Sequence, residues 1–385
     1  MFAPTRLFLS LRPNAAVGLL AGSAFVAAMF AATPFLLPEI ADRYGVALGT
    51  AGLSSAVQVS GFGAAAFVAG RRLSPDRSLM IGAGLVLVAT GVGSALSTEF
   101  GVLLGLRLVA GAASGVVVWL AWVDTMGDRS IMRDVAATGP LTVLLFAPFL
   151  GWLAGHGGDQ AVYWALAAAA LPIAFLPVQF SAMPPRGRRT MSPSRSNVVL
   201  LVALGLLTMF GSSLFVYSAA VGRDLVGLGD VAVALGFSVN AGAGLVGARL
   251  GRRPRSAWPW LATIAASVVV MVFVPEPAAF FAAMAVWGFA FWMAVPTVLG
   301  GIAAWSLAPE ERVGDAQSIM AVGRAAGPAA GGIVLGASTT FGPLAVFAAG
   351  GLVAAAAVTA AVERYRRHHE PSHLGLPPIA GGLSE

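Results

Sequence analysis

Apolar runs long enough to cross a lipid bilayer recur about twelve times along this 385-residue chain. Inside a bilayer each run must satisfy its own backbone polar groups, so continuous apolar runs of this length fold as helices. The chain is 58% hydrophobic and only 10% charged, which excludes an ordinary soluble domain. We therefore predict an all-α membrane protein with twelve transmembrane helices. They are expected near residues 15–37, 48–69, 78–97, 101–124, 135–155, 160–180, 197–219, 229–249, 257–274, 278–305, 313–338 and 342–362.

The arginines predict how these helices are oriented. The sequence contains no lysine, so all 23 basic residues are arginines. If the N-terminus is cytoplasmic, 19 of them fall in cytoplasmic segments, Arg43 and Arg223 fall outside, and Arg107 and Arg324 fall within helices. Such a bias sets orientation, so both termini are predicted to be cytoplasmic, and no nucleic-acid partner is needed to explain the basic composition. The lysine-free, alanine-rich usage is typical of a GC-rich bacterial genome and indicates the bacterial inner (plasma) membrane.

A polar and basic segment, residues 181–196, divides the chain. It separates an N-terminal six-helix half, residues 1–180, from a C-terminal six-helix half, residues 197–362. Residues 363–385 are polar and rich in proline and glycine, so we expect a disordered cytoplasmic tail.

The two halves resemble an internal repeat. Gly70-Arg71-Arg72-Leu73 and Gly247-Ala248-Arg249-Leu250 stand 177 residues apart, each at the end of an even-numbered predicted helix. Pro148 and Pro328 stand 180 residues apart. Near-equal offsets indicate duplication, which is a common plan in secondary transporters.

The predicted eleventh helix carries three glycines on one face. Gly323, Gly327 and Gly331 are spaced by four residues, so they lie above one another on a helix. Such a face lets two membrane helices approach closely, and Pro328 removes a backbone hydrogen bond and favours a bend. The pattern predicts a tightly packed, bendable gating helix, with Pro148 in a related position of the first half. A static packing helix is the alternative.

Four local motifs resemble those of the major facilitator superfamily, and the resemblance extends over essentially the whole chain. Helix 11 carries the glycine–proline signature, and Arg107 to Gly111 fit the R-x-x-x-G pattern of helix 4. The inner-loop signature is present in the second half except that Ala248 replaces its acid, and the copy after Gly70 is poorer. The second-half motif consists of Gly244, Arg249, Gly251, Arg252 and Arg253. The resemblance implies two six-helix halves that rock around a central cavity.

Two arginines within predicted helices are the strongest candidates for a substrate site. A charge inside the bilayer is costly unless it is paired or hydrated, and no acid lies at the depth of Arg324. An anionic ligand, cavity water or carbonyls near Pro328 are the alternatives. Arg107 lies closer to a helix end, so extension to the interface is its alternative. Polar and aromatic residues expected to line the same cavity are Gln58, Asn240, Trp119 and Trp287.

Together these features predict a secondary transporter. We expect proton-coupled efflux of a small anionic or amphipathic molecule by a monomer, with uptake or exchange of an organic anion as the alternative. A non-transporting receptor or a membrane enzyme is a further alternative, but the predicted helices hold no cysteine, histidine or clustered acids for catalysis. We expect no cofactor and no metal. Asp124 and Glu39 are the candidate proton carriers.

Overall fold

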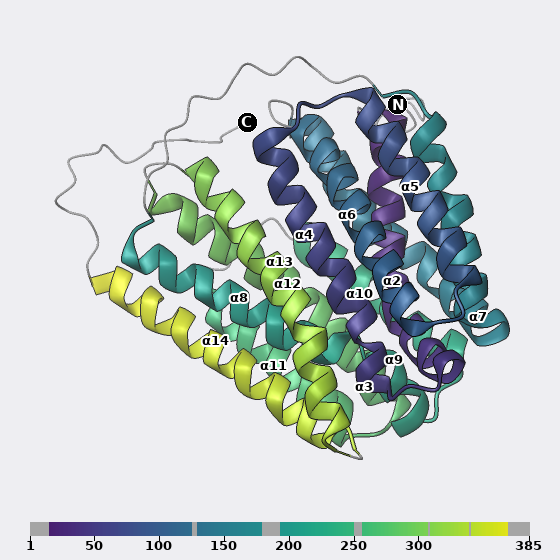
Figure 1. Cartoon of the computed structure of the whole chain (residues 1–385). Coiled ribbons are helices and arrows are strands. Elements are labelled where there is room, and N and C mark those ends of the chain that lie inside the picture. The colour runs from purple at the N-terminus through teal and green to yellow at the C-terminus, as the bar shows by residue number, and fades with distance from the viewer. Residues whose placement is uncertain are drawn as a thin grey trace, which may run out of the picture.

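The computed structural model describes residues 15–124, 129–178, 193–249, 256–306, 309–338 and 340–368, and these residues form helices joined by short turns (Figure 1). Ten helices in this part of the chain are long and apolar enough to cross a membrane, and α11 is a shorter apolar helix. An all-helical membrane protein is therefore confirmed. The helices are α2 (Val17–Tyr44), α3 (Leu48–Ala51), α4 (Leu53–Arg72), α5 (Arg77–Leu96), α6 (Phe100–Asp124), α7 (Arg129–Phe175), α8 (Arg195–Phe215), α9 (Ser218–Ala220), the π-helix η1 (Val221–Leu225), α10 (Asp230–Arg249), α11 (Trp258–Phe273), α12 (Pro277–Ala304), α13 (Pro309–Gly336) and α14 (Gly342–His368).

Helix α7 is two antiparallel arms. Its 47 residues include Gly158, whose backbone is non-helical with φ 62° and ψ −167°. Asp134 on the first arm accepts a hydrogen bond from the backbone of Ala15, and the chain just after the second arm packs against Gly18. Both contacts are at the start of α2, whereas Asp159 beside the bend contacts Arg43 at the end of α2. The chain therefore reverses at Gly158.

These contacts define two sides of the molecule. We call the side where α2 begins and α14 ends the terminus side, and the side of the Gly158 bend the far side. On the terminus side, Asp76 caps α5 by accepting hydrogen bonds from the backbone and hydroxyl of Ser78. These hydrogen bonds lower the pKa of Asp76, because they favour the charged carboxylate.

We refer to α2–α7 and α8–α14, the helices before and after residues 179–192, as the two helix groups. In Figure 1, α8 and α14 run obliquely to α2, α5 and α6. Within the second group Gly351 of α14 lies directly against the ring of Phe210 on α8. The groups also contact one another: α4 and α3 meet α13, and the first arm of α7 meets α10.

Helix α14 continues past residue 362, where the sequence analysis ended it. Glu363 accepts hydrogen bonds from the backbone of Ala257 and from the Ser256 hydroxyl at the start of α11. Arg366 donates to the carbonyl of Gly301 at 2.7 Å and to the side chain of Asn197 at 2.7 Å. These contacts extend the helix to His368 because they tie its last turn to the terminus-side ends of α8, α11 and α12.

Candidate transport pathway

The two helix groups touch backbone to backbone on the far side. A side chain at Gly49 of α3 would overlap the carbonyl of Gly332 on α13, and the reverse is also true. The buried hydroxyl of Tyr217 donates to the Pro328 carbonyl at 2.9 Å and lies 3.5 Å from the Gly49 carbonyl. The far side is therefore closed at this level, with glycine required on both faces.

A salt-bridge cluster also joins the groups on the far side. Arg223 of η1 donates to Glu39 at the end of α2 through Nη1 at 2.8 Å. Its Nε lies 2.6 Å from Asp230 Oδ1 at the start of α10, without the alignment of a hydrogen bond. The Glu39 bond crosses between the groups, so it must break if the far side opens.

We predict that Glu39→Gln shifts the protein toward a far-side-open state. Loss of one partly exposed ion pair should raise the ratio of far-side-open to far-side-closed protein by up to about fivefold. The measurement is the rate at which an impermeant maleimide modifies Ala51→Cys, a position that is fully buried in the closed far side. Glu276→Gln, which removes an exposed acid elsewhere on the far side, is the control. Equal rates in the two variants would show that Glu39 does not hold the gate.

The groups separate toward the terminus side. Gly63 of α4 packs near Ala321 of α13, but one turn further Phe67 is 49% exposed and Gln317 on α13 is also exposed. Among the described residues, α4 and α13 are therefore closely packed on the far side and more exposed toward the terminus side.

The three glycines of α13 all pack against α8. A side chain at Gly323 would lie 2.5 Å from the carbonyl oxygen of Gly205, and side chains at Gly327 and Gly331 would overlap backbone carbonyls of α8. Pro328 is buried in the same helix. The close helix approach expected from the glycine spacing is therefore present, and whether this helix moves stays a prediction.

Arg324 faces the space between the helix groups. Val322 and Ile333 are 63% and 74% exposed and mark the outer surface of α13, and Arg324 is about 200° around the helix from Val322. That direction falls between the glycine face on α8 and the Ala321 face on α4. Arg324 is exposed, and no hydrogen bond or ion pair involves it among the described residues. Its charge is free to meet a ligand.

Arg107 is placed differently. It is only 4% exposed, it donates to Gln58 Oε1 at 3.4 Å, and its guanidinium lies 4.7 Å from the ring centroid of Tyr163. Within the described residues, Arg107 Nε, Gln58 Nε2 and the Tyr163 hydroxyl are buried without a hydrogen-bond partner. The alternative that the Arg107 side chain extends to the membrane interface is therefore wrong, because the side chain is held between α4, α6 and α7.

The other expected cavity residues lie mostly in helix contacts. Asn240 donates to the Met284 carbonyl at 2.9 Å, Trp287 is buried against Phe215, and Trp119 lies near Gly70. A contribution of any of them to substrate binding stays a prediction.

The remaining motif residues are only partly visible. Gly244 lies against the ring of Trp292, where a side chain would meet it at 2.5 Å, and Pro148 lies within the first arm of α7. The side chains of Asp124 and Arg249 lie outside the described part of the structure, as do Gly251, Arg252 and Arg253 entirely.

Sequence reasoning missed the structural roles of two far-side arginines. Arg43 donates to the carbonyls of Ser94, Ala95 and Ser97 and to Asp159, so it braces the end of α5. Arg223 holds the cluster described above. Both arginines were predicted to lie outside, against the bias of the other arginines. This exception was the sequence signal that could have identified them.

The chain is similar to known transporters. No known family profile matches it. It is 30% identical over 372 residues to a chloramphenicol resistance protein of Streptomyces lividans, covering 84% of this chain and 90% of that one. The chain belongs to the major facilitator superfamily. It is therefore a multi-pass membrane transporter rather than an enzyme.

Solved structures share the fold of this major facilitator protein. A bacterial homologue of the human lysosomal transporter Spinster, inward-facing and occupied, matches with a TM-score of 0.67 and 16% identity over 96% of this chain and 97% of that one. A variant of the nucleoside transporter NupG matches with a TM-score of 0.64 and 14% identity over 90% of this chain and 99% of that one. At these identities the comparison establishes the fold alone.

Proposed function

We propose that this protein exports a small drug-like molecule across the bacterial plasma membrane in exchange for protons. The observation that carries the proposal is the 30% identity to a chloramphenicol resistance protein over most of both chains. The geometry supports it, because a protein closed on one side and open on the other represents one end state of alternating access. The protein works as a monomer in this proposal.

We further propose twelve transmembrane spans. The two arms of α7 count separately because 47 helical residues would extend about 70 Å, more than twice the hydrocarbon thickness. Helix α11 supplies the remaining span. Residues 1–180 and 197–362 are then the two rocking halves joined by 181–196, with both termini and the terminus side in the cytoplasm. The structure accordingly represents the inward-open state.

This orientation predicts opposite accessibility of two exposed loop positions. The chain has no cysteine, so Thr98→Cys between α5 and α6 and Leu73→Cys after α4 each introduce one thiol. In intact cells an impermeant maleimide should modify Thr98→Cys at least ten times faster, since only the far side faces outward. Permeabilised cells provide the control, where both should react. Equal modification in intact cells would contradict the proposed topology.

Transport by everted membrane vesicles tests the function. Vesicles with this protein should accumulate compounds such as chloramphenicol when a proton gradient is imposed, and a protonophore should abolish the accumulation. Vesicles carrying an equal amount of Gly327→Leu serve as the control. Accumulation that persists after the gradient has collapsed would exclude proton coupling, and gradient-driven loss of compound would indicate uptake.

The second candidate is an organic-anion permease, favoured by the exposed and unpaired Arg324.

Proton coupling in either case needs a group that changes charge. Glu39 lies in the far-side cluster, where its bond to Arg223 would break on protonation, and Asp124 at the end of α6 stays the alternative proton carrier.

A further inference from the structure

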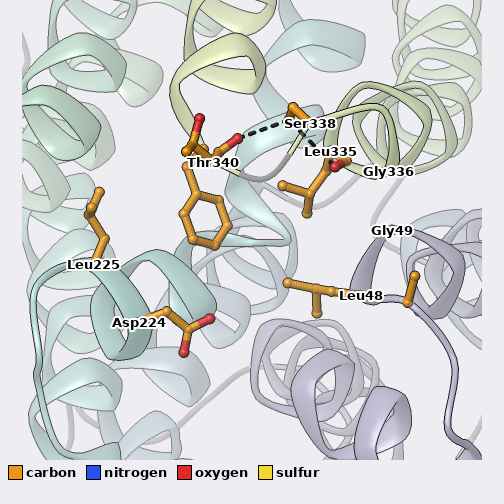
Figure 2. Close-up of a pocket in the computed structure, with 10 residues that line it drawn as sticks. Leu48, Gly49, Asp224, Leu225, Leu335, Gly336, Ser338 and Thr340 are labelled. Carbon is orange, nitrogen blue, oxygen red and sulfur yellow. Dashed lines mark hydrogen bonds between the residues drawn. The ribbon is translucent and has the colours of Figure 1, made fainter.

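A second space lies on the far side of the molecule, above the closed gate (Figure 2). It is a cavity of about 500 Å³, which is the size of a small-molecule site. Figure 2 shows Asp224 and Leu225 on one side, Leu48 and Gly49 on the other, and Leu335 at the upper edge. The cavity is separate from the space that Arg324 faces, because the Tyr217 and Gly332 contacts lie between them.

The walls of this far-side cavity come from both helix groups. Leu48 and Gly49 belong to α3 of the first group, whereas Asp224, Leu335 and Phe341 belong to the second. Gly49 is also one partner of the close contact with Gly332 that must separate when the far side opens. The cavity in this shape therefore exists only while the far side is closed.

The chemistry of the cavity favours a cation. Asp224 supplies one carboxylate, which forms no salt bridge among the described residues; Arg223 attracts this carboxylate from outside the cavity and Asp42 repels it. Ser338 and Thr340 add oxygen atoms, and the Ser338 hydroxyl proton is already directed at the carbonyls of Leu335 and Thr340. No arginine lines the cavity. The remaining walls are mainly apolar, so a ligand with one positive charge and a hydrophobic body would satisfy both features.

We propose that the far-side cavity is a regulatory site for lipophilic monocations, distinct from the transport pathway. A ligand that contacts both walls binds the closed far side more tightly than the open one. It must therefore shift the population toward the inward-open state and slow transport from the far side. The inference goes beyond the proposed export function, and its binding test does not depend on which molecule is transported.

Binding of methyltriphenylphosphonium to the purified full chain in lipid nanodiscs tests the charge requirement. Triphenylphosphine oxide, similar in shape and neutral, is the matched probe. Asp224→Asn should weaken binding of the cation about fivefold, the range of a partly exposed ion pair, and leave the neutral probe unchanged. Glu276→Gln controls for the general far-side potential. Leu48→Trp, which fills the cavity, should weaken binding of both probes.

The proposed shift toward the inward-open state is measured separately from binding. Spin labels at Leu73→Cys and Arg195→Cys lie on the terminus-side ends of the two groups, and the cation should increase the fraction with a long inter-label distance. The same addition should have less effect in Asp224→Asn. Unchanged cation affinity in Asp224→Asn would overturn the site, as would a shift toward short distances. Loss of binding in Glu276→Gln equal to that in Asp224→Asn would reduce the effect to surface charge and also overturn it.

Discussion

Replacement of Gly327 by leucine is expected to abolish transport while leaving protein in the membrane. Even a Cβ at this position would overlap the Met209 carbonyl of α8, and backbone cannot move aside as a flexible side chain can. The leucine would push α13 away from α8 and displace the contact between Tyr217 and the carbonyl of Pro328, the next residue in the chain. Because small residues permit this helix approach, the closed far side should no longer form.

Gly350→Leu is the matched control. It is the same substitution in the neighbouring helix α14, but a side chain at Gly350 meets nothing within 4 Å. Vesicle transport per mole of membrane-inserted protein should fall by at least about tenfold in Gly327→Leu, corresponding to about 1.4 kcal/mol, and stay within about twofold in Gly350→Leu. Normal transport by Gly327→Leu would show that this helix contact is not needed during the cycle.

Much of the fold follows from the sequence because membrane helices obey strong local constraints. Apolar length identified the spans, and the glycine spacing at Gly323, Gly327 and Gly331 indicated a close contact without naming α8 as the partner. The partner depends on how helices distant in sequence assemble, which no local pattern contains. By contrast, the reversal at Gly158 lies in the gap between the predicted spans 135–155 and 160–180, so the sequence did place this break.

The candidate site was less predictable because charge placement depends on which direction a helix faces. Arg107 and Arg324 look alike in sequence, yet one is buried beside Tyr163 and the other faces the space between the groups. Tyr217 carries no motif, and its role depends on carbonyls from α3 and α13. Arg223 was visible only as an exception to the arginine bias.

Replacement of Arg324 by glutamine is expected to reduce transport of an anionic substrate by at least about tenfold. The side chain faces the space between the groups and has no protein partner in the described structure, so a ligand or water must solvate its charge. Because no described contact is lost, the amount of folded protein should stay near normal. Arg77→Gln, which removes an exposed arginine at the start of α5, is the control for overall charge.

The decisive comparison uses an anionic and a neutral compound in the same variant. If Arg324 meets a negative group on the substrate, Arg324→Gln should impair the anion far more than neutral chloramphenicol. If it instead supports the bend at Pro328, both compounds should suffer alike and the melting temperature should fall. Equal loss with unchanged stability would exclude an anion site and assign Arg324 to a step common to all substrates, such as keeping a nearby acid ionised for proton exchange.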